Sequence, residues 1–491
     1  MHPAKANYSR IRIGPSHEND RLYDLLRTYV QQPTRARTVT EIVIDPDHWS
    51  AHHSSFAFKD QDRIEKFDLD DEILDEAHIA LQEYARSLAL DDKMTAQLIL
   101  RLDRKQRQMV NTWEDAEDSR EEVNDKFAAA ATLLLFSLCE NISTLYIGET
   151  LYDEMLIEYM LNTNYKQIKS PGLQKLQHVR FITCALSDEK AYGNIEILQY
   201  LQLIHRLPAL ESVTLEAIEE YQAYRHFFIP RTGNMRKLKI SHCDISGNLL
   251  AIIISIPKSL EELKLSLGGL WCRDGGRPLV RPYQIARALA AYRNSLRVLD
   301  IDLDFVVQET IDEWWDVNED DNSNNGGTES DYDDYGRGRL TSDQAISSNH
   351  KIGSKGEAKD YGRTIGSLHD FPHLTHLSIS IITLLGSYDN YEPPYRLLKS
   401  APFQLVNALP PNLEYLCIYG YVRGQNPDAD KHIDELLEKK DEKLTKLQVI
   451  NGVDEHLPSI RDIFGTDDEP REDNLYQRET LDLDWKLVQD V

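Results

Sequence analysis

The chain has 491 residues, of which 41% are hydrophobic and 28% charged, and its formal net charge is −27 at pH 7. This balance is that of a globular protein with a large core, and the length predicts two or three packing units. The negative charge argues against a protein that grips nucleic acid or anionic lipid, because both would repel it.

The five cysteines stand singly, without a Cys-x-x-Cys pair. An odd number of isolated thiols is typical of a reducing compartment, where cysteines stay free. The N-terminal stretch MHPAKANYSRIR lacks the apolar core of a secretion signal, and the longest apolar runs, 128–138 and 249–256, are too short to cross a bilayer. We therefore expect an intracellular protein, cytoplasmic or nuclear, without a membrane span.

Residues 1–61 are predicted to form a lead-in of one helix and one strand. RLYDLLRTYV at 21–30 has apolar residues at helical spacing, and Pro33 ends that helix. TVTEIVI at 38–44 alternates and predicts a strand.

Residues 62–140 are predicted to be helical, because apolar side chains recur at helical spacing from Ile73 to Leu88. The stretch 112–126 is mostly charged, which we interpret as a solvated helix face or a connector. The largely apolar stretch 127–139 predicts a helix packed under the next unit.

From residue 141 a pattern of the form L-x-x-L-x-[LIV] recurs. Its copies are Ile142-Leu145-Ile147, Leu176-Val179-Phe181, Leu210-Val213-Leu215, Met235-Leu238-Ile240, Leu260-Leu263-Leu265, Leu296-Leu299-Ile301, Leu374-Leu377-Ile379, Leu413-Leu416-Ile418 and Leu444-Leu447-Val449. Most copies follow a Pro or Asn, several follow an apolar or amphipathic helix, and the first six copies start about 25 to 36 residues apart.

A strand and a helix repeated in this way cannot bury their apolar faces alone, but stacked copies share one continuous core. We therefore predict an α/β fold: a divergent leucine-rich-repeat-like solenoid with a parallel sheet and outer helices, over 141–316 and 361–455. The Asn- and Asp-rich stretch 317–360 is predicted to be a disordered acidic insertion, and 456–491 an acidic C-terminal tail.

Motifs that carry chemistry are missing from the sequence. Asp316-x-Asn318-x-Asp320 starts like a calcium loop, but Asp321 and Gly327 stand where the turn glycine and the final glutamate belong. His242–Cys243 has no second pair at zinc spacing, and no nucleophile elbow or phosphate loop is present. We expect no enzymatic activity, no cofactor and no metal.

The repeat series resembles the filamentous-fungal F-box and leucine-rich-repeat-like proteins. The resemblance rests on RLYDLLRTYV with the strand at 38–44, the apolar helix that ends at Cys139, NISTLYI at 141–147, and the segments LPALESVTL, SLEELKL and LRVLDI. The F-box start, Leu-Pro-x-Glu-Leu, is not found in the chain. The resemblance implies a substrate receptor of a cullin-type ubiquitin ligase, with other ligase subunits as partners.

A solenoid binds through the exposed positions of its strands, which share one face. We expect that face to carry His178, Arg180, Thr214, Lys237, Lys239, Lys264, Asp300, Asp302, Tyr415 and Tyr419. The lysines predict a basic centre, unless Glu262 and the aspartates neutralise them, and the tyrosines predict an aromatic anchor.

Asp300, Asp302 and Asp304 alternate with apolar residues, which places them on one sheet face. They could be an acidic stripe for a basic partner, a metal pair, or the ordinary polar face of a strand, which we prefer. Protein–protein recognition is thus the leading function, and the alternative is a scaffold that binds through the charged insertion and tail.

Overall fold

The computed structural model describes most of the chain, with gaps. The described residues are 8–13, 19–44, 75–110, 117–148, 153–169, 171–181, 192–220, 228–270, 280–304, 364–386, 388–389, 396–397 and 403–464. They fall into two compact units, one within Met1–Cys184 and Gln199–Thr214 and the other within Ala185–Leu198 and Leu215–Gln477, which we name unit 1 and unit 2. The predicted insertion at 317–360 and residues 465–491 of the predicted tail lie outside the described residues. The prediction of a tail is wrong for 456–464, because these residues end in the helix α16 (Ile460–Phe464) and bury Ser459, Ile460 and Phe464 against unit 2.

Unit 1 is an α/β structure of parallel strands with helices between them. Its strands follow the order of the chain: β1 (Arg10–Ile13), β2 (Glu41–Ile44), β3 (Thr144–Ile147), β4 (His178–Phe181) and β6 (Ser212–Glu216). Its helices are α1 (Asn19–Gln31), α2 (Pro33–Ala36), α3 (Glu76–Ser87), α4 (Asp92–Val110), α5 (Glu117–Leu138) and α6 (Glu154–Asn164), and α7 (Ile197–Ile204) precedes β6.

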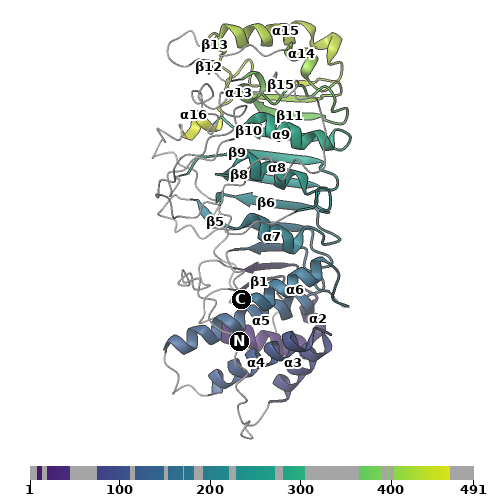
Figure 1. Ribbon diagram of the computed structural model, residues 1–491, viewed down its shortest axis with the longest axis vertical. Coiled ribbons are helices and arrows are strands. Elements are labelled where there is room, and N and C mark those ends of the chain that lie inside the picture. Colours follow the sequence, from purple (N-terminus) through teal and green to yellow (C-terminus); the bar gives the residue numbers. More distant parts are fainter. Residues whose placement is uncertain are drawn as a thin grey trace, which may run out of the picture. The chain divides into compact units, whose positions relative to one another are not determined.

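Three of these helices, α3, α4 and α5, occupy the described part of the predicted helical segment 62–140 (Figure 1). They pack with one another, and α1 packs on α3 and α5. The second half of α5 is apolar around its circumference, from Phe127 to Phe136, and every residue of that stretch is buried. This helix is the core of the helical part of unit 1.

Unit 2 has the same alternation of parallel strands and helices. Its main strands are β8 (Lys237–Cys243), β9 (Glu262–Leu267), β10 (Val298–Asp302), β11 (His376–Ser380), β14 (Tyr415–Tyr419) and β15 (Val449–Asn451). Helices α8 (Gly247–Ser255) and α9 (Pro282–Leu289) lie side by side along β8, β9 and β10 (Figure 1).

The remaining described elements of unit 2 are short, apart from α15. They are β5 (Gly193–Ile195) paired with β7 (Ile218–Glu220), β12 (Tyr388–Asp389) paired with β13 (Arg396–Leu397), and the helices α13 (Ile381–Leu385), α14 (Leu405–Ala408), α15 (Pro427–Lys443) and α16 (Ile460–Phe464).

The register of the strands follows the sequence pattern. Leu263 lies opposite Leu238 on one side and Leu299 on the other, and Leu377 then continues the row to Leu416. These leucines are fully or almost fully buried. In unit 1, Leu145 lies opposite Val179, and Val179 opposite Val213. The predicted register is therefore confirmed within unit 1 for the first three copies and within unit 2 for the copies from Met235 to Leu413.

The turns before the strands explain the recurring asparagines. Asn141 Nδ2 donates to the carbonyl of Arg37 at 2.7 Å, and Asn412 Nδ2 donates to the carbonyl of Pro372 at 2.8 Å. Each side chain thus satisfies a backbone acceptor in the preceding turn, so it ties one strand–helix unit to its neighbour.

Two strands with the same spacing precede the predicted first copy. In β2, Ile42 lies opposite Leu145 of β3, and in β1, Ile11 lies opposite Ile42. Both isoleucines are fully buried. The predicted lead-in therefore supplies two strands to the sheet of unit 1, and its patterns, Tyr8-x-x-Ile11-x-Ile13 and Val39-x-x-Ile42-x-Ile44, match the repeat.

The predicted register of the last copy is wrong by three residues. Leu416 lies opposite Ile450, not Leu447, and Val449 is 42% exposed instead of buried. The cause is a Leu at both 444 and 447: Leu444 is buried as it caps the end of α15, and the strand begins only after Gln448.

Among the helices of the described residues, none carries an apolar stretch of sufficient length to cross a bilayer.

Candidate functional site

The outward-pointing side chains of unit 2 form rows across neighbouring strands. The strand register places Lys237, Glu262, Val298, His376 and Tyr415 in one row, and Lys239, Lys264, Asp300 and Ser378 in the next. We name these nine residues, with Tyr419, the strand face. Apolar residues between them point into the core, because successive side chains of a strand point to opposite faces.

The basic part of the strand face contains a carboxylate. Lys239 lies opposite Lys264 in the register, but Lys264 Nζ is 3.4 Å from Glu262 Oε1. Glu262 also lies opposite Lys237. The alternative in which an acidic neighbour balances the lysines is therefore favoured over an uncompensated basic patch.

The aspartates of β10 do not share one surface, which corrects our prediction for Asp302. Asp300 is half-buried on the strand face, and burial raises its pKa although the hydroxyl of Tyr419 donates to its Oδ1 at 3.1 Å. Asp302 is only 9% exposed and Asp304 only 4%. Residues 456–464 cover both, and Ile460 N donates to Asp302 Oδ2 at 2.7 Å. Asp302 is therefore not available to a partner.

The aromatic part of the strand face is ordered by its own contacts. The rings of His376 and Tyr415 stack with centroids 5.9 Å apart and planes at 24°. Asn451 Nδ2 donates to the Tyr415 hydroxyl at 3.1 Å, and Val449 lies opposite Tyr415 in the register. Val449 and Asn451 therefore extend this part of the face, and our wrong register for the last copy concealed both.

The three candidates of unit 1 also lie together. His178 lies opposite Ser212, with Nδ1 2.8 Å from Ser212 Oγ, and Arg180 lies opposite Thr214. Tyr146 of β3 is the next residue in the row, opposite Arg180. Unit 1 thus has a half-buried strand row of its own, with an arginine between an aromatic and a threonine.

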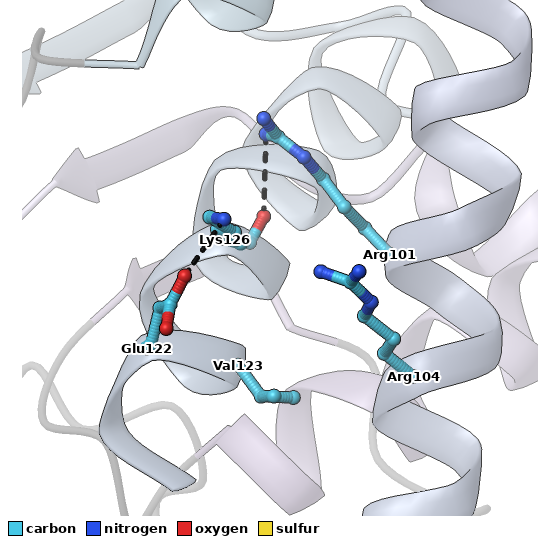
Figure 2. Close-up of a pocket in the computed structure, with 5 residues that line it drawn as sticks. All are labelled: Arg101, Arg104, Glu122, Val123 and Lys126. Carbon is cyan, nitrogen blue, oxygen red and sulfur yellow. Dashed lines mark hydrogen bonds and ion pairs between the residues drawn. The ribbon is translucent and has the colours of Figure 1, made fainter. Parts of the chain in front are cut away.

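A hollow of about 130 Å³ lies between α4 and α5 (Figure 2). Arg101 and Arg104 extend from α4 toward Glu122, Val123 and Lys126 of α5. Arg101 Nη1 is 2.7 Å from Asp153 Oδ2, and Lys126 Nζ is 2.8 Å from Glu122 Oε1.

Two of the three cations at this hollow are therefore paired with carboxylates of the protein. The geometry is that of a salt-bridged helix contact, and we assign no anion-binding role to it.

The described cysteines do not suit nucleophilic chemistry. Cys139, Cys243 and Cys417 are buried free thiols, and burial raises the pKa of Cys243 to about 12. A thiol that stays protonated at neutral pH is a poor nucleophile. In the described part of the chain, no three His, Cys, Asp or Glu side chains gather in a way that could hold a metal ion.

Comparison with known proteins gives no match: none is found with a protein-family model, a curated protein or a solved structure.

Proposed function

We propose that the chain is a divergent leucine-rich-repeat-like solenoid that recognises a protein partner and catalyses no reaction. The chain-ordered parallel strands of each unit, the helices between them and the rows of buried leucines support the repeat architecture. The rows of outward-pointing polar and aromatic side chains on the strand face carry the functional part of the proposal.

The anchor of the binding surface is the aromatic end of the strand face. Tyrosine is frequent among the residues that dominate binding energy in interfaces. Stacking on His376 and the hydrogen bond from Asn451 restrain Tyr415 before any partner binds. A restrained side chain loses little conformational entropy on binding, which favours affinity.

The chemistry of the face indicates the kind of partner. Val449 adds an exposed apolar side chain beside Tyr415, and Lys237, Lys239, Glu262 and Asp300 lie on the neighbouring strands. We expect a protein segment that places an apolar side chain on Tyr415 and Val449 and flanks it with charges of both signs.

The test starts from a photo-crosslinking amino acid placed at Ser378, which lies between Asp300 and Cys417 in the register. The same group at Ile229, which is exposed and belongs to no described strand, is the control. A partner captured from cells only through Ser378 is then purified and titrated against variants.

The Tyr415→Ala variant should weaken binding of that purified partner by at least about tenfold, the effect of losing one anchor residue. Ile229→Ala should bind as the wild type does. The Lys239→Glu/Lys264→Glu variant should mainly change the salt dependence of association. Unchanged affinity for both Tyr415→Ala and His376→Ala would refute the proposed site.

The same captured partner distinguishes two more specific functions, a ubiquitin-ligase receptor and a scaffold. If the chain is a receptor of a cullin-type ubiquitin ligase, as the F-box-type resemblance implies, the partner is its substrate and a ligase subunit co-purifies with the complex. If the chain is a scaffold that binds through its charged insertion, a variant that lacks 317–360 loses the partner while Tyr415→Ala keeps it.

A further inference from the structure

Residues 456–464, which we name the strap, cross the ends of several strands of unit 2. Gly420, directly after β14, donates its N–H to the carbonyl of Leu457 at 2.8 Å. Ile460 N donates to Asp302 at the end of β10. The Phe464 ring meets the His242 ring of β8 edge to face, with centroids 5.5 Å apart. The strap therefore closes over the carboxyl ends of the sheet.

The backbone at Gly420 lies close to both the Asp304 carboxyl and the strap. Gly420 has φ +70, and a Cβ there would lie 3.1 Å from Asp304 Oδ2 and 3.2 Å from Ser459 Cβ. A larger residue would be strained in its backbone and would press on the strap. Glycine at this position is what allows the strap to sit directly on the Asp304 carboxyl.

The strap covers two carboxyl groups with different hydrogen-bond partners. Asp302 accepts from two backbone N–H groups, those of Ile460 at 2.7 Å and Asp304 at 3.2 Å. Asp304 is more deeply buried, and its Oδ1 has no hydrogen-bond partner within the described chain, although side-chain hydrogen bonds with Ser380 and Ser459 partly stabilise its carboxylate. Two backbone donors stabilise an ionised Asp302 directly, whereas Asp304 lies deeper and next to that charge. The geometry therefore favours Asp304 as the member of the pair that holds a proton.

The surrounding charges do not neutralise a second carboxylate. The groups that face the pair are Asp300 on β10, Tyr419 on β14, Ser380 on β11, and His456, Ser459 and Asp462 on the strap, with Lys264 and Glu262 beyond Asp300 on β9. Lys264 is 3.4 Å from Glu262, and His456 Nε2 is 3.6 Å from Asp462. Both basic groups thus already lie beside a carboxylate.

We propose that the strap is a proton-dependent latch: it stays closed over the ends of β10, β11 and β14 while the Asp302–Asp304 pair holds one proton, and it loosens when that proton is lost. Proton loss from Asp304 would place a second buried negative charge next to Asp302 and near Asp462, and the strap carries the groups that can move away. Burial raises the pKa of Asp302 to about 6 and that of Asp304 well above its ordinary range, in agreement with this geometry.

Hydrogen–deuterium exchange of the full-length protein tests the latch. Protection of a peptide that covers 458–464, corrected for the intrinsic pH dependence of exchange, is measured at pH 5 and pH 8.5. We expect protection to fall by at least about tenfold at the higher pH, because up to tenfold per pH unit follows from one linked proton. Equal protection at both pH values would overturn the proposal.

Two variants identify the responsible group. Asp304→Asn has the same shape and carries no charge, so its strap should stay protected at pH 8.5. His456→Gln should keep the wild-type fall, which separates the effect of the aspartate pair from that of the His456–Asp462 contact within the strap. If His456→Gln abolishes the fall while Asp304→Asn retains it, the latch is not the aspartate pair.

If Asp304→Asn does not fold, an NMR titration of the wild-type protein tests the latch instead. Carboxyl carbon signals of ¹³C-labelled aspartate and the amide of Ile460 are followed from pH 4 to pH 9. The proposal requires the amide to change with the same midpoint as one buried carboxyl, and a strap amide that is constant through that transition would refute it.

Discussion

In the strands of unit 2, one side chain is buried in the core and the next lies on the strand face. Leu299 is fully buried among Leu263 and Leu377, whereas its neighbour Asp300 stands on the strand face beside Lys264. The difference comes from the pleat alone, because successive side chains point to opposite faces. A single substitution therefore tests either the core or the surface, depending on which face of the sheet the substituted side chain points to.

Leu263→Ala or Leu299→Ala should lower the free energy of unfolding by about 2–5 kcal/mol, through lost burial and the cavity left behind. The exposed Val449→Ala on β15 is the matched control and should change it by less than about 0.5 kcal/mol. Chemical denaturation measures both. A small loss at Leu263 and Leu299 would mean that these leucines are not packed as the register requires.

Asp304→Asn should change how stability depends on pH. A carboxyl group whose pKa is raised by folding binds more protons in the folded state, so stability falls as pH rises from its ordinary value through the raised one. For Asp302 that window is about pH 4 to about pH 6. Asp304 extends the loss to higher pH, because its own pKa is raised further by burial and by Asp302.

The variant should therefore be more stable than the wild type at pH 8, and the difference should shrink toward pH 4. Denaturant titrations across that range provide the measurement. A constant difference at every pH would show that Asp304 does not titrate with folding.

At this scale the sequence predicted which residues of the pattern are buried, but not the burial of Asp302 and Asp304. The alternation of β10 correctly separates its aspartates from its core residues. Their cover comes from Ile460, which is 158 positions away along the chain. No local pattern contains that information, so the aspartates looked like surface residues.

The helices α1, α4 and α5 are joined by a buried lysine of α4, a contact that the overall composition does not reveal. Lys105 of α4 is only 1% exposed. Its Nζ donates to Asp20 in the first turn of α1 at 2.6 Å, to Gln108 at 2.9 Å and to Asn124 of α5 at 2.7 Å. The same Nζ lies 5.6 Å from the centroid of the Phe127 ring. One buried ammonium group thus joins three helices of unit 1.

Lys105→Met should keep the packing of the stem but leave the side-chain oxygens of Gln108 and Asn124 without this donor. The expected loss of unfolding free energy is about 1–3 kcal/mol, the cost of an unsatisfied buried polar group. Arg104→Met, at the next and more exposed position of α4, is the control and should cost less than about 0.5 kcal/mol. Equal effects of the two variants would contradict a joining role for Lys105.

Helices were the elements most readily predicted, because their apolar periodicity is long. Strands β1 and β2 fit the repeat, yet the helices α3 to α5 separate them from it, so β2 was predicted only as part of a lead-in and β1 was not predicted. The last strand was placed three residues early because Leu444 and Leu447 offered a competing match. Short strands offer few residues to fix their register, and neighbouring strands supply the rest.

The whole chain carries a formal charge of −27, and like charges on a compact chain repel one another. Added salt screens this repulsion, so raising NaCl from about 20 to about 300 mM should increase the melting temperature by a few degrees. A thermal scan at constant pH measures it, with a neutral osmolyte at equal osmolality as the control. A fall would mean that ion pairs such as Arg10–Glu41, at 2.8 Å, outweigh the repulsion.

At the same scale, the sequence predicted the α/β class and the succession of parallel strands. It offered the neutralisation of the lysines by Glu262 as an alternative but could not decide it, because the other neighbours of Glu262 and Lys264 come from β8 and β10. It gave no signal for the helix contact at Arg101, since the partner Asp153 lies on another element.

The strap also limits how many strands can lie between β10 and β14. A series of stacked units is open-ended in principle, and it can gain or lose a member at little structural cost. Here the chain that leaves β15 returns across β14 and β10 to reach His242, and its anchors match the spacing of the strands beneath. One additional strand between β10 and β14 would separate Gly420 from Asp302 by a further ~4.8 Å. The three residue steps from Leu457 to Ile460 could not bridge that distance, so insertion of a strand between β10 and β14 would break the closure.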